Sequence, residues 1–370
     1  MREGLGITLC VDALEHELGG IGRYTWELSQ RLPKRHEISS VRYFVRNRLI
    51  DDPARLLRGE RIYPGRGLRR AGRAWIAGLA LRSSVVHAPN YFLPRRAATG
   101  IITVHDLSVF RFPETHPSER IRQFERQFED SMTRAVHVIT DTETVRRELI
   151  DTFGVSDKRV TAVALGVSDR FRPSGKVPRG KSFAKWGIEP GRYGLCVSAL
   201  EPRKKVAELL VAWRRLPLRL RDRYPLVLAG GAGWRNDKIR EQVNAGELEG
   251  WVRHLGHIDD VDLPQLYSQA ALFVYPSIYE GFGLPPLEAM ASGVPIVVAN
   301  RSCLPEVCGD VPLYVDPDND NEFLSTLEEA LESNEWRAEA IRRGLERASR
   351  FTWNRCIEDT VAVYKDVVDH

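Results

Sequence analysis

The sequence has few of the features that mark secreted, membrane-spanning or metal-cluster proteins. Its five cysteines are scattered along 370 residues without a Cys-x-x-Cys pair, which argues against a disulfide framework and against a zinc ribbon. No apolar run of about eighteen residues occurs, and the N-terminus lacks the apolar segment of a signal peptide. Short repeats and low-complexity segments are also missing. With 43% hydrophobic and 28% charged residues, the chain is expected to be globular and cytoplasmic.

Lysine is scarce, with 9 residues against 45 arginines, and the charge is unevenly distributed. Residues 1–172 carry 29 basic and 21 acidic residues, a net charge of +8, whereas residues 173–370 carry 25 and 29, a net charge of −4. Between residues 41 and 96, thirteen arginines face three acidic residues. Such a surface could bind an anionic membrane or nucleic acid, or it could be a solvated surface that binds no partner. No zinc-finger or RNA-binding motif accompanies it, which disfavours nucleic acid and leaves the other two.

The length predicts two domains, and apolar strands alternate with amphipathic helices along the chain. The glycine turn 19–22 comes after strand 6–11, and the apolar residues that follow the turn have the spacing of a helix. A stretch rich in Pro, Gly and Lys at 172–181 interrupts the alternation and predicts a linker. The expected fold class is therefore α/β, with two doubly wound, Rossmann-like units. Further expected strands are 41–45, 84–87, 101–104, 137–140, 193–198, 225–229, 252–255, 272–275, 295–299 and 313–315, and expected helices are 144–152, 206–215, 236–245, 263–269, 286–291 and 322–331.

The most informative motif runs Tyr275-Pro-Ser-Ile-Tyr-Glu-Gly-Phe-Gly-Leu-Pro-Pro-Leu-Glu-Ala-Met-Ala-Ser-Gly-Val-Pro295. A strand ends at Tyr275, a glycine-containing turn follows, and Pro286 suits the first position of a helix, which would put Glu288 in the first helical turn. Free backbone N–H groups at such a helix start bind phosphates or polar sugars, and ligands of doubly wound sheets lie at these strand ends. Two carboxylates there, Glu280 and Glu288, can each accept hydrogen bonds from a sugar diol. The alternative is that they only end the loop and cap the helix.

Glu280 and Glu288, separated by seven residues in this context, resemble the Glu-x7-Glu signature of retaining glycosyltransferase family 4. Other segments resemble that family in the same order along the chain. The resemblance implies the GT-B fold: an N-terminal acceptor domain of residues 1–172, a C-terminal nucleotide-sugar domain of residues 173–352 and an interdomain cleft, with helix 353–370 returning to the first domain. The other matching segments are the glycine loop 19–24, the strand ends 86–91 and 103–107, residues 164–168, and Leu200-Glu-Pro-Arg-Lys204.

The resemblance also implies roles for residues of the C-terminal domain. Arg203 and Lys204 would neutralise the donor diphosphate, because a guanidinium beside an ammonium suits two adjacent phosphates. Glu288 would bind the ribose, and Glu280 would lie near the transferred sugar. An ordinary basic cluster at a helix start is the alternative for Arg203 and Lys204, and Lys205 replaces the family's asparagine, so its capping role is open. Further expected donor contacts are the backbone N–H groups of Gly281, Phe282, Gly283 and Leu284. Ile258 would contact the nucleobase of the donor through its backbone.

In the N-terminal domain, His105 follows strand 101–104, and the family counterpart hydrogen-bonds the donor sugar. The expected catalytic set is therefore His105, Glu280, Arg203 and Lys204. The glycine loop would approach the diphosphate or the acceptor. Asp106 orients either its loop or the imidazole, and the sequence does not decide between them. The remaining expected contacts are Gly20 and Gly22 for the donor, and Arg23, Tyr91 and Asp106 for the acceptor side.

Neither a metal nor a cofactor is expected, since the nucleotide sugar is a substrate. Asp316-Pro-Asp318 has the Asp-x-Asp spacing that holds a divalent cation in another glycosyltransferase fold, but here it follows a late strand and is interpreted as an acidic turn before a helix. Arg203 and Lys204 would then do what Mg²⁺ does elsewhere. The resemblance implies retention by front-face attack, with the leaving phosphate helping to deprotonate the acceptor, and no side chain is assigned as nucleophile.

The motifs resemble those of bacterial enzymes that build O-antigen, lipopolysaccharide or exopolysaccharide with mannose or rhamnose. GDP-mannose is the first expected donor, and dTDP-rhamnose or another nucleoside-diphosphate hexose is the alternative. The expected partner is a glycan or polyprenyl-diphosphate-linked acceptor, which would bring the basic domain to the inner leaflet. Segment 68–79 combines an apolar face with arginines and would either lie on that membrane or pack as an ordinary helix. A catalytically silent subunit that binds nucleotide sugars or glycans is the alternative from another functional class.

Overall fold

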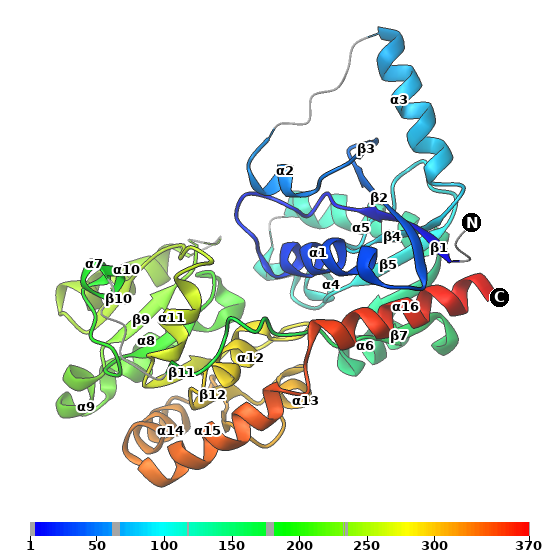
Figure 1. The fold of residues 1–370 in the computed structure, drawn as a ribbon. Coiled ribbons are helices and arrows are strands. Elements are labelled where there is room, and N and C mark those ends of the chain that lie inside the picture. The colour runs from blue at the N-terminus through cyan, green and yellow to red at the C-terminus, as the bar shows by residue number, and fades with distance from the viewer. Residues whose placement is uncertain are drawn as a thin grey trace. The chain divides into compact units, whose positions relative to one another are not determined.

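The computed structural model describes residues 4–60, 67–116, 118–174, 181–231, 233 and 236–369, in two compact units (Figure 1). Unit 1 comprises residues 1–111, 117–166 and 353–370, and unit 2 comprises residues 112–116 and 167–352. Each unit contains one predominantly parallel sheet with helices packed against it, which confirms the expected fold class. Residues 175–180 of the expected linker lie outside the described residues.

The sheet of unit 1 has the strand order β3-β2-β1-β4-β5-β6-β7, and all neighbours are parallel except the β2–β3 hairpin. The chain order reverses between β1 and β4, which is the place where ligands bind in such sheets. Central β5 is buried along its whole length, as expected for a strand covered on both faces. The strands are β1 (Leu5–Cys10), β2 (Ile38–Val45), β3 (Arg48–Ile50), β4 (Val85–Ala88), β5 (Gly100–Val104), β6 (Ala135–Thr140) and β7 (Val160–Ala162).

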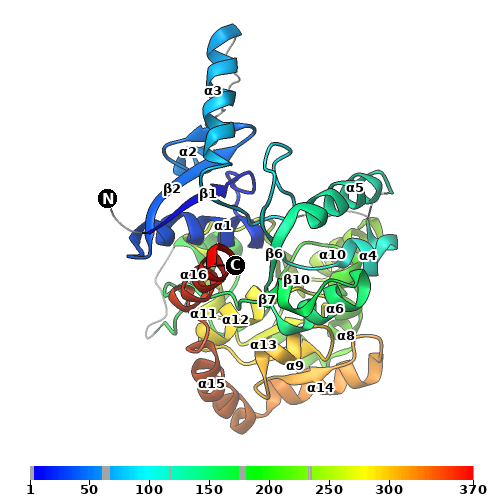
Figure 2. The same cartoon turned by 90° about the vertical axis from the view of Figure 1, so that its right-hand side faces the viewer.

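The last helix of the chain belongs to unit 1 and lies beside α1 in both views (Figure 2). Arg31 of α1 donates a hydrogen bond to Asn354 Oδ1 at 2.6 Å. Buried Tyr364 joins its hydroxyl to His87 Nδ1 at 2.7 Å, so α16 reaches the central strand β4. The helices of unit 1 are α1 (Gly20–Arg31), α2 (Ala54–Leu57), α3 (Gly67–Ala80), α4 (Ser108–Arg111), α5 (Ser118–Arg134), α6 (Glu143–Phe153) and α16 (Trp353–Asp369).

The sheet of unit 2 is fully parallel and has the order β10-β9-β8-β11-β12-β13. This is the doubly wound order of dinucleotide-binding folds, with its switch point between β8 and β11. The strands are β8 (Gly194–Val197), β9 (Leu226–Ala229), β10 (Val252–His254), β11 (Leu272–Tyr275), β12 (Ile296–Ala299) and β13 (Leu313–Val315), and the helices are α7 (Lys181–Trp186), α8 (Val206–Arg215), α9 (Leu218–Arg223), α10 (Asp237–Leu248), α11 (Leu263–Ser268), α12 (Leu284–Ala291), α13 (Leu304–Cys308), α14 (Asp320–Glu332) and α15 (Asn334–Ala348).

The core of unit 2 is packed around the buried Trp213 of α8. A Cβ added to Gly194, the first residue of β8, would lie 2.1 Å from the Trp213 ring, so only glycine allows the indole to reach the strand. The indole N–H donates to the Tyr224 carbonyl at 3.0 Å and is therefore not left unpaired in the core. This contact seats α8 against β8, and the site described next lies on the loop that joins them.

Candidate functional site

The loop after β8 carries the basic residues that the sequence assigned to the diphosphate. A 3₁₀ turn, Pro202–Lys204, ends at Lys205, which has a left-handed backbone (φ 53°) and precedes α8. Lys205 makes no side-chain cap. Its ammonium instead pairs with Glu208 at 2.8 Å and with Asp318 at 2.7 Å. Lys205 therefore ties α8 to the acidic turn before α14, while Arg203 and Lys204 turn the other way, toward β11.

Lys204, Tyr275 and Glu280 form a closed triangle of hydrogen bonds. The Lys204 ammonium donates to Glu280 Oε1 at 2.5 Å and to the Tyr275 hydroxyl oxygen at 3.2 Å. The Tyr275 hydroxyl donates to the same Oε1 at 2.8 Å. Arg203 Nη1 lies 3.7 Å from Glu280 Oε2 and donates to the Tyr279 carbonyl. The structure thus brings three residues of the expected catalytic set into contact within unit 2.

The protonation state of Glu280 follows from these neighbours. The residue is only 9% exposed, and burial by itself raises the pKa of a carboxyl group. The nearby charges of Lys204 and Arg203 outweigh burial and lower the pKa of Glu280 to about 2. Burial and the Glu280 carboxylate together raise the pKa of Tyr275 well above its ordinary value. Glu280 is therefore a carboxylate that only accepts hydrogen bonds, and Tyr275 is a hydroxyl that donates.

The backbone of Glu280 is fixed as well as its side chain. Its N–H donates to Ser302 Oγ at 3.3 Å, and the Ser302 hydroxyl donates back to the Glu280 carbonyl at 2.7 Å. The Cys303 thiol donates to the same carbonyl at 3.1 Å. Ser302 has a left-handed backbone (φ 53°), which is uncommon for a residue with a side chain and is often found at functional sites. Both the carboxylate and its peptide group are therefore held in place.

Helix α12 begins earlier than the sequence predicted, which corrects the position of Glu288. Gly283 precedes the helix with φ 97°, a conformation that favours glycine, and an added Cβ would lie 2.9 Å from Leu304. The helix therefore starts at Leu284 rather than at Pro286. Glu288 is its fifth residue, so it lies in the second turn and not in the first, which contains no acidic residue.

The residues directly after Glu280 are buried. Gly281, Phe282 and Gly283 are buried, and the Phe282 ring packs against Phe351 with ring centroids 5.8 Å apart. Leu284 follows as the first residue of α12. In the second turn, the Glu288 carboxylate adds to the effect of burial and raises the pKa of Tyr267 well above its ordinary value. Each glutamate of the motif thus has a buried tyrosine as a neighbour.

A second glycine loop, after β9, closes tightly on the loop after β8. Gly230 has φ 142°, and an added Cβ would lie 2.1 Å from the Ser198 carbonyl oxygen. Its N–H donates to the Gly256 carbonyl at 2.7 Å, and Gly256 itself is left-handed at φ 65°. Ile258, which is expected to contact the nucleobase of the donor, comes after the carboxyl end of β10 and is buried. The loops that follow β8, β9 and β10 therefore contact one another, and glycine allows their backbones to approach closely.

In unit 1, His105 lies at the end of β5 with both ring nitrogens engaged. Nδ1 is 2.7 Å from Asp141 Oδ2, and Nε2 is 2.8 Å from the Pro89 carbonyl oxygen. A carboxylate and a carbonyl only accept hydrogen bonds, so with Asp141 ionised both nitrogens carry protons. Burial lowers the pKa of His105, but the charge and hydrogen bond of Asp141 outweigh it, and the pKa is raised above its ordinary value. The raised pKa favours the protonated imidazole, which can donate in both directions.

The other expected residues of unit 1 surround this imidazole. Tyr91 is buried and left-handed (φ 59°), and its ring centroid lies 5.8 Å from that of His105. Its hydroxyl accepts from the Asp106 N–H at 3.0 Å, while the Asp106 carboxylate accepts from the Ser108 N–H at 2.8 Å. Asp106 thus orients its own loop at the start of α4, one of the two roles left open. Since Tyr91 is buried, its hydroxyl supports that loop.

Helix α1 brings the N-terminal glycine loop to the same place. Tyr24, on the second turn of α1, lies edge-on to His105 with ring centroids 5.3 Å apart. Gly20 starts the helix, and Gly22 is buried where an added Cβ would lie 3.1 Å from the Ala13 carbonyl oxygen. The first turn contains no acidic residue and includes Arg23, so the positive end of the helix is reinforced.

Asp141 and Tyr275 are the residues that sequence reasoning missed. Both lie at the carboxyl end of a strand that the sequence predicts: Asp141 directly follows β6, and Tyr275 is the last residue of β11. The carboxyl ends of parallel strands meet at one edge of a sheet, so both belong to the sites expected there. The sequence did not show which polar group each would contact.

The acidic turn before α14 is neutralised by basic side chains. Asp316 pairs with Arg301 at 2.9 Å, and Asp318 pairs with Lys205. Among the residues that the structure describes, no group of three or more His, Cys, Asp or Glu side chains is arranged to hold a metal ion.

Comparison with known proteins covers nearly the whole chain. The family model described as Glycosyltransferase Family 4 matches residues 18–171, and the model described as Glycosyl transferases group 1 matches residues 178–347. The O-antigen chain mannosyltransferase B of Escherichia coli is 36% identical over 378 residues, which cover 97% of this chain and 99% of that protein. The O-antigen chain mannosyltransferase RfbU of Salmonella typhimurium is 30% identical over 229 residues, 61% of this chain and 59% of that protein.

The solved structures that resemble the chain share its fold at low sequence identity. HepE from Anabaena, crystallised in complex with UDP-glucose, superposes with a TM-score of 0.74 over 98% of this chain and 100% of its own, at 17% identity. WaaG, described as a glycosyltransferase involved in lipopolysaccharide biosynthesis, superposes with a TM-score of 0.71 at 16% identity, over 97% of this chain and 99% of its own. Both likenesses concern the fold.

Proposed function

The chain belongs to the glycosyltransferases of family 4, and from this premise we propose that it transfers mannose from GDP-mannose to a glycan of a growing O-antigen. The observation that carries the proposal is the buried contact of Arg203, Lys204 and Glu280 at the carboxyl end of β11. The likeness to O-antigen mannosyltransferases of two bacteria supports the choice of sugar and pathway. The acceptor is a glycan carried on a polyprenyl diphosphate.

The charges of unit 2 suit the leaving group of such a reaction. Arg203 and Lys204 bind the donor diphosphate and stabilise the negative charge that grows on it as the glycosidic bond breaks. Glu280 accepts hydrogen bonds from the hydroxyls of the transferred sugar, and Glu288 binds the ribose. In unit 1, a sugar hydroxyl that replaces the Pro89 carbonyl accepts a hydrogen bond from His105 Nε2.

The proposed reaction retains the configuration of the sugar and needs no metal ion. The acceptor hydroxyl attacks the anomeric carbon from the side of the departing diphosphate, and its proton passes to a phosphate oxygen. The two cations supply the charge that a divalent ion supplies elsewhere. Anomer analysis of the product by NMR tests retention, and an inverted product refutes it. Full activity in excess EDTA supports metal independence, whereas loss that Mg²⁺ restores overturns it.

The decisive experiment measures transfer from a panel of nucleotide sugars to a lipid-linked glycan. We expect GDP-mannose to give the highest turnover, and dTDP-rhamnose is the competing donor in the same panel. Lys204→Ala and Glu280→Ala should each reduce turnover by about 10²- to 10³-fold, as loss of one transition-state contact does. Turnover that survives both substitutions refutes the assigned site. Binding without turnover by the unaltered protein on every acceptor would favour a silent binding subunit.

Helix α3 supports a further part of the proposal, association with an anionic membrane surface. It stands out from the rest of unit 1 in both views (Figures 1 and 2). Trp75, Ile76 and Leu79 share one side of the helix and are 67%, 53% and 43% exposed. Ala77 and Ala80 are buried, so the helix packs through small residues and leaves large apolar ones in solvent. An exposed patch of this kind marks an interaction surface.

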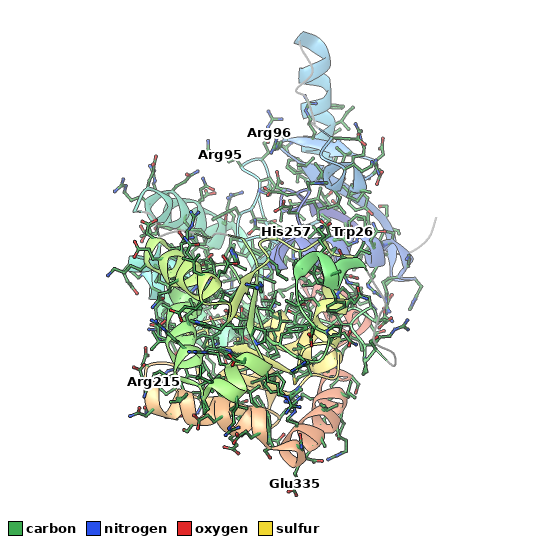
Figure 3. The ribbon with its side chains drawn as sticks, turned by 90° about the vertical axis from the view of Figure 1, so that its left-hand side faces the viewer. Trp26, Arg95, Arg96, Arg215, His257 and Glu335 are labelled. Carbon is green, nitrogen blue, oxygen red and sulfur yellow. The ribbon has the colours of Figure 1, made fainter. Side chains whose placement is uncertain are left out.

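The surrounding charge indicates which partner that surface takes. Residues 61–105 contain eight arginines and neither aspartate nor glutamate. Among them, Arg95 and Arg96 are exposed at the surface of unit 1 (Figure 3). Apolar side chains next to many cations suit a bilayer with anionic headgroups. In the described residues no helix has the length and apolar character needed to cross a membrane.

Sedimentation with liposomes tests this association. We expect the protein to pellet with vesicles of phosphatidylglycerol and to stay in solution with neutral phosphatidylcholine vesicles, and added salt should weaken the binding. Replacing Trp75, Ile76 and Leu79 together by serine should reduce binding about tenfold or more while leaving transfer to a water-soluble acceptor unchanged. Equal binding to both kinds of vesicle contradicts the proposal.

A further inference from the structure

The contact between Lys204 and Glu280 conflicts with the separate tasks that the proposed function gives them. Lys204 binds the donor diphosphate and Glu280 binds the transferred sugar, yet in this structure the ammonium is bonded to the carboxylate at 2.5 Å. Both side chains are nearly buried, at 12% and 11% exposed. When the ammonium turns to a phosphate, the carboxylate loses its nearest cation. A buried carboxylate that loses a hydrogen-bond partner becomes costly to keep in place.

Arg203 replaces little of that contact. Its Nη1 is 3.7 Å from Glu280 Oε2, beyond hydrogen-bond distance, and the same nitrogen donates to the Tyr279 carbonyl. Ser302 and Cys303 bond the backbone of Glu280 and not its carboxylate. The Ser277 hydroxyl does hydrogen-bond the Glu280 side chain, but it is shared with the Arg203 and Tyr279 carbonyls. Ser302 and Cys303 thus fix the backbone of Glu280, and the orientation of its carboxylate depends on side-chain partners.

Tyr275 is placed to supply that orientation. Its hydroxyl donates to Glu280 Oε1 at 2.8 Å and also accepts from Lys204 at 3.2 Å. The residue ends β11, is 2% exposed, and its ring lies parallel to that of Phe273, with 17° between the planes and 6.0 Å between the centroids. A buried ring on a strand of the central sheet has little freedom to move. The Lys204 ammonium also lies 5.5 Å from the centre of the Tyr275 ring, so it contacts the tyrosine as well as the carboxylate.

We propose that Tyr275 is a positioning residue, which keeps the Glu280 carboxylate aimed at the transferred sugar when Lys204 leaves it for the donor diphosphate. The tyrosine hydroxyl then stays bonded to Glu280 Oε1 whether the Lys204 ammonium is bonded to the carboxylate or to a phosphate. The inference rests on the proposed function, since it needs a donor with a diphosphate and a sugar. It predicts that the tyrosine matters for the sugar and much less for the nucleotide.

The experiment compares two ligands on Tyr275→Phe, which removes the hydroxyl and keeps the ring. Calorimetry measures the affinity for GDP-mannose and for GDP, and steady-state kinetics measure kcat and KM. We expect the affinity for GDP-mannose to fall about tenfold and kcat to fall about ten- to a hundredfold, as for a lost hydrogen bond to a charged group. The affinity for GDP should change less than about twofold, because GDP lacks the sugar that Glu280 contacts.

Tyr193→Phe is the matched control. Tyr193 is also fully buried in unit 2, and its hydroxyl donates to the Leu266 carbonyl at 2.5 Å. Loss of that hydroxyl should lower both affinities equally or not at all. If Tyr275→Phe likewise weakens GDP and GDP-mannose by the same factor, its role is merely structural and the inference is overturned. Unchanged affinity for GDP-mannose with unchanged kcat overturns it too.

The failure of the proposed function would look different, because it shows in the unaltered protein. If another donor from the panel is turned over instead, the same comparison is made with that nucleotide sugar and its own nucleoside diphosphate. If the unaltered protein binds no nucleotide sugar, the proposed function fails and the role of Tyr275 fails with it.

Discussion

The two units each hold a buried ion pair at the carboxyl end of a central strand, and the two pairs differ in how they hold protons. In unit 1, His105 and Asp141 follow β5 and β6, and the pKa of each is raised. In unit 2, Glu280 follows β11 and its pKa is lowered to about 2. Both sites lie in parallel sheets with the same kind of switch point. The fold therefore does not decide the protonation of the site.

The number of cations beside each carboxylate decides it. Asp141 has one cationic partner, itself titratable, and burial raises the pKa of Asp141 by more than that partner lowers it. Glu280 has two cationic neighbours, Lys204 and Arg203, and their charges outweigh burial. Unit 1 thus holds a proton that can be lost, and unit 2 holds a fixed arrangement of charge. The four predictions below, on stability and protonation, test this difference.

The largest effect is expected from Lys204→Met. The substitution leaves the buried Glu280 carboxylate without its nearest cation, and breaking a buried pair from one side costs about 3–5 kcal/mol. The free energy of unfolding of unit 2, measured by urea denaturation with hydrogen exchange to identify the unit, should fall by that amount. The double variant Lys204→Met with Glu280→Gln should recover most of the stability without recovering activity. A single variant as stable as the unaltered protein would show that the pair is not buried as described.

A smaller loss is expected in unit 1 from Asp141→Asn. The amide oxygen still accepts from His105 Nδ1, but the charge is gone, so the cost should be about 1–3 kcal/mol. Without that charge, burial dominates and the pKa of His105 should fall below its ordinary value. NMR titration of the imidazole measures this. An unchanged pKa for His105 would refute the importance of Asp141.

The pH dependence of stability should have opposite signs in the two units. The pKa of His105 is raised on folding, so its contribution is present below about pH 6.5 and is lost as the pH rises through the folded value. The raised pKa of Asp141 acts in the same direction. The pKa of Glu280 is lowered on folding, so its contribution is present above about pH 4.5 and is lost as the pH falls toward about 2.

Hydrogen exchange followed peptide by peptide separates these two effects. Unit 1 should lose protection on the alkaline side, and Asp141→Asn should reduce that loss. Unit 2 should lose protection on the acid side, and Glu280→Gln should reduce it. Identical pH profiles for the two units would remove the contrast drawn here.

The smallest effect is expected from Lys205→Met, one residue from the site. Its ammonium pairs with Glu208 and Asp318, whose side chains are 31% and 54% exposed, so solvent weakens both pairs. The free energy of unfolding should change by less than about 1 kcal/mol, and turnover should stay within about twofold. A loss comparable to that of Lys204→Met would show that proximity in sequence, rather than burial, sets the effect.

Much of the fold was readable from the sequence, because buried parallel strands are short apolar runs with clear borders. Helix α5 was not predicted, since its apolar residues Ile121, Phe124 and Phe128 are interspersed with many charges. The start of α12 was wrong by two residues, which puts Glu288 in the second turn instead of the first, because that start depends on the left-handed Gly283. The motif indicated Arg203, Lys204 and Glu280 together, but not their contact with Tyr275.

The partners of His105 show a second limit. A strand end predicts that a polar side chain lies at the edge of a sheet, and it does not predict which neighbour that side chain faces. Asp141 lies 36 residues further along the chain, and its contact with the imidazole depends on the order of β5 and β6. Contacts of this kind follow from strand order, which a single sequence shows only through the fold class.

The return of α16 to unit 1 has a consequence for how the protein is made. His87 and Tyr364 are 277 positions apart, and all of unit 2 is synthesised between them. During translation, residues 167–352 leave the ribosome as an almost complete unit, while unit 1 still lacks its last helix. The sheet that carries His105 therefore acquires α16 as a neighbour only after unit 2 has been synthesised. A nascent chain that stops short of α16 contains the buried contact of Arg203, Lys204 and Glu280 in unit 2 without a finished unit 1.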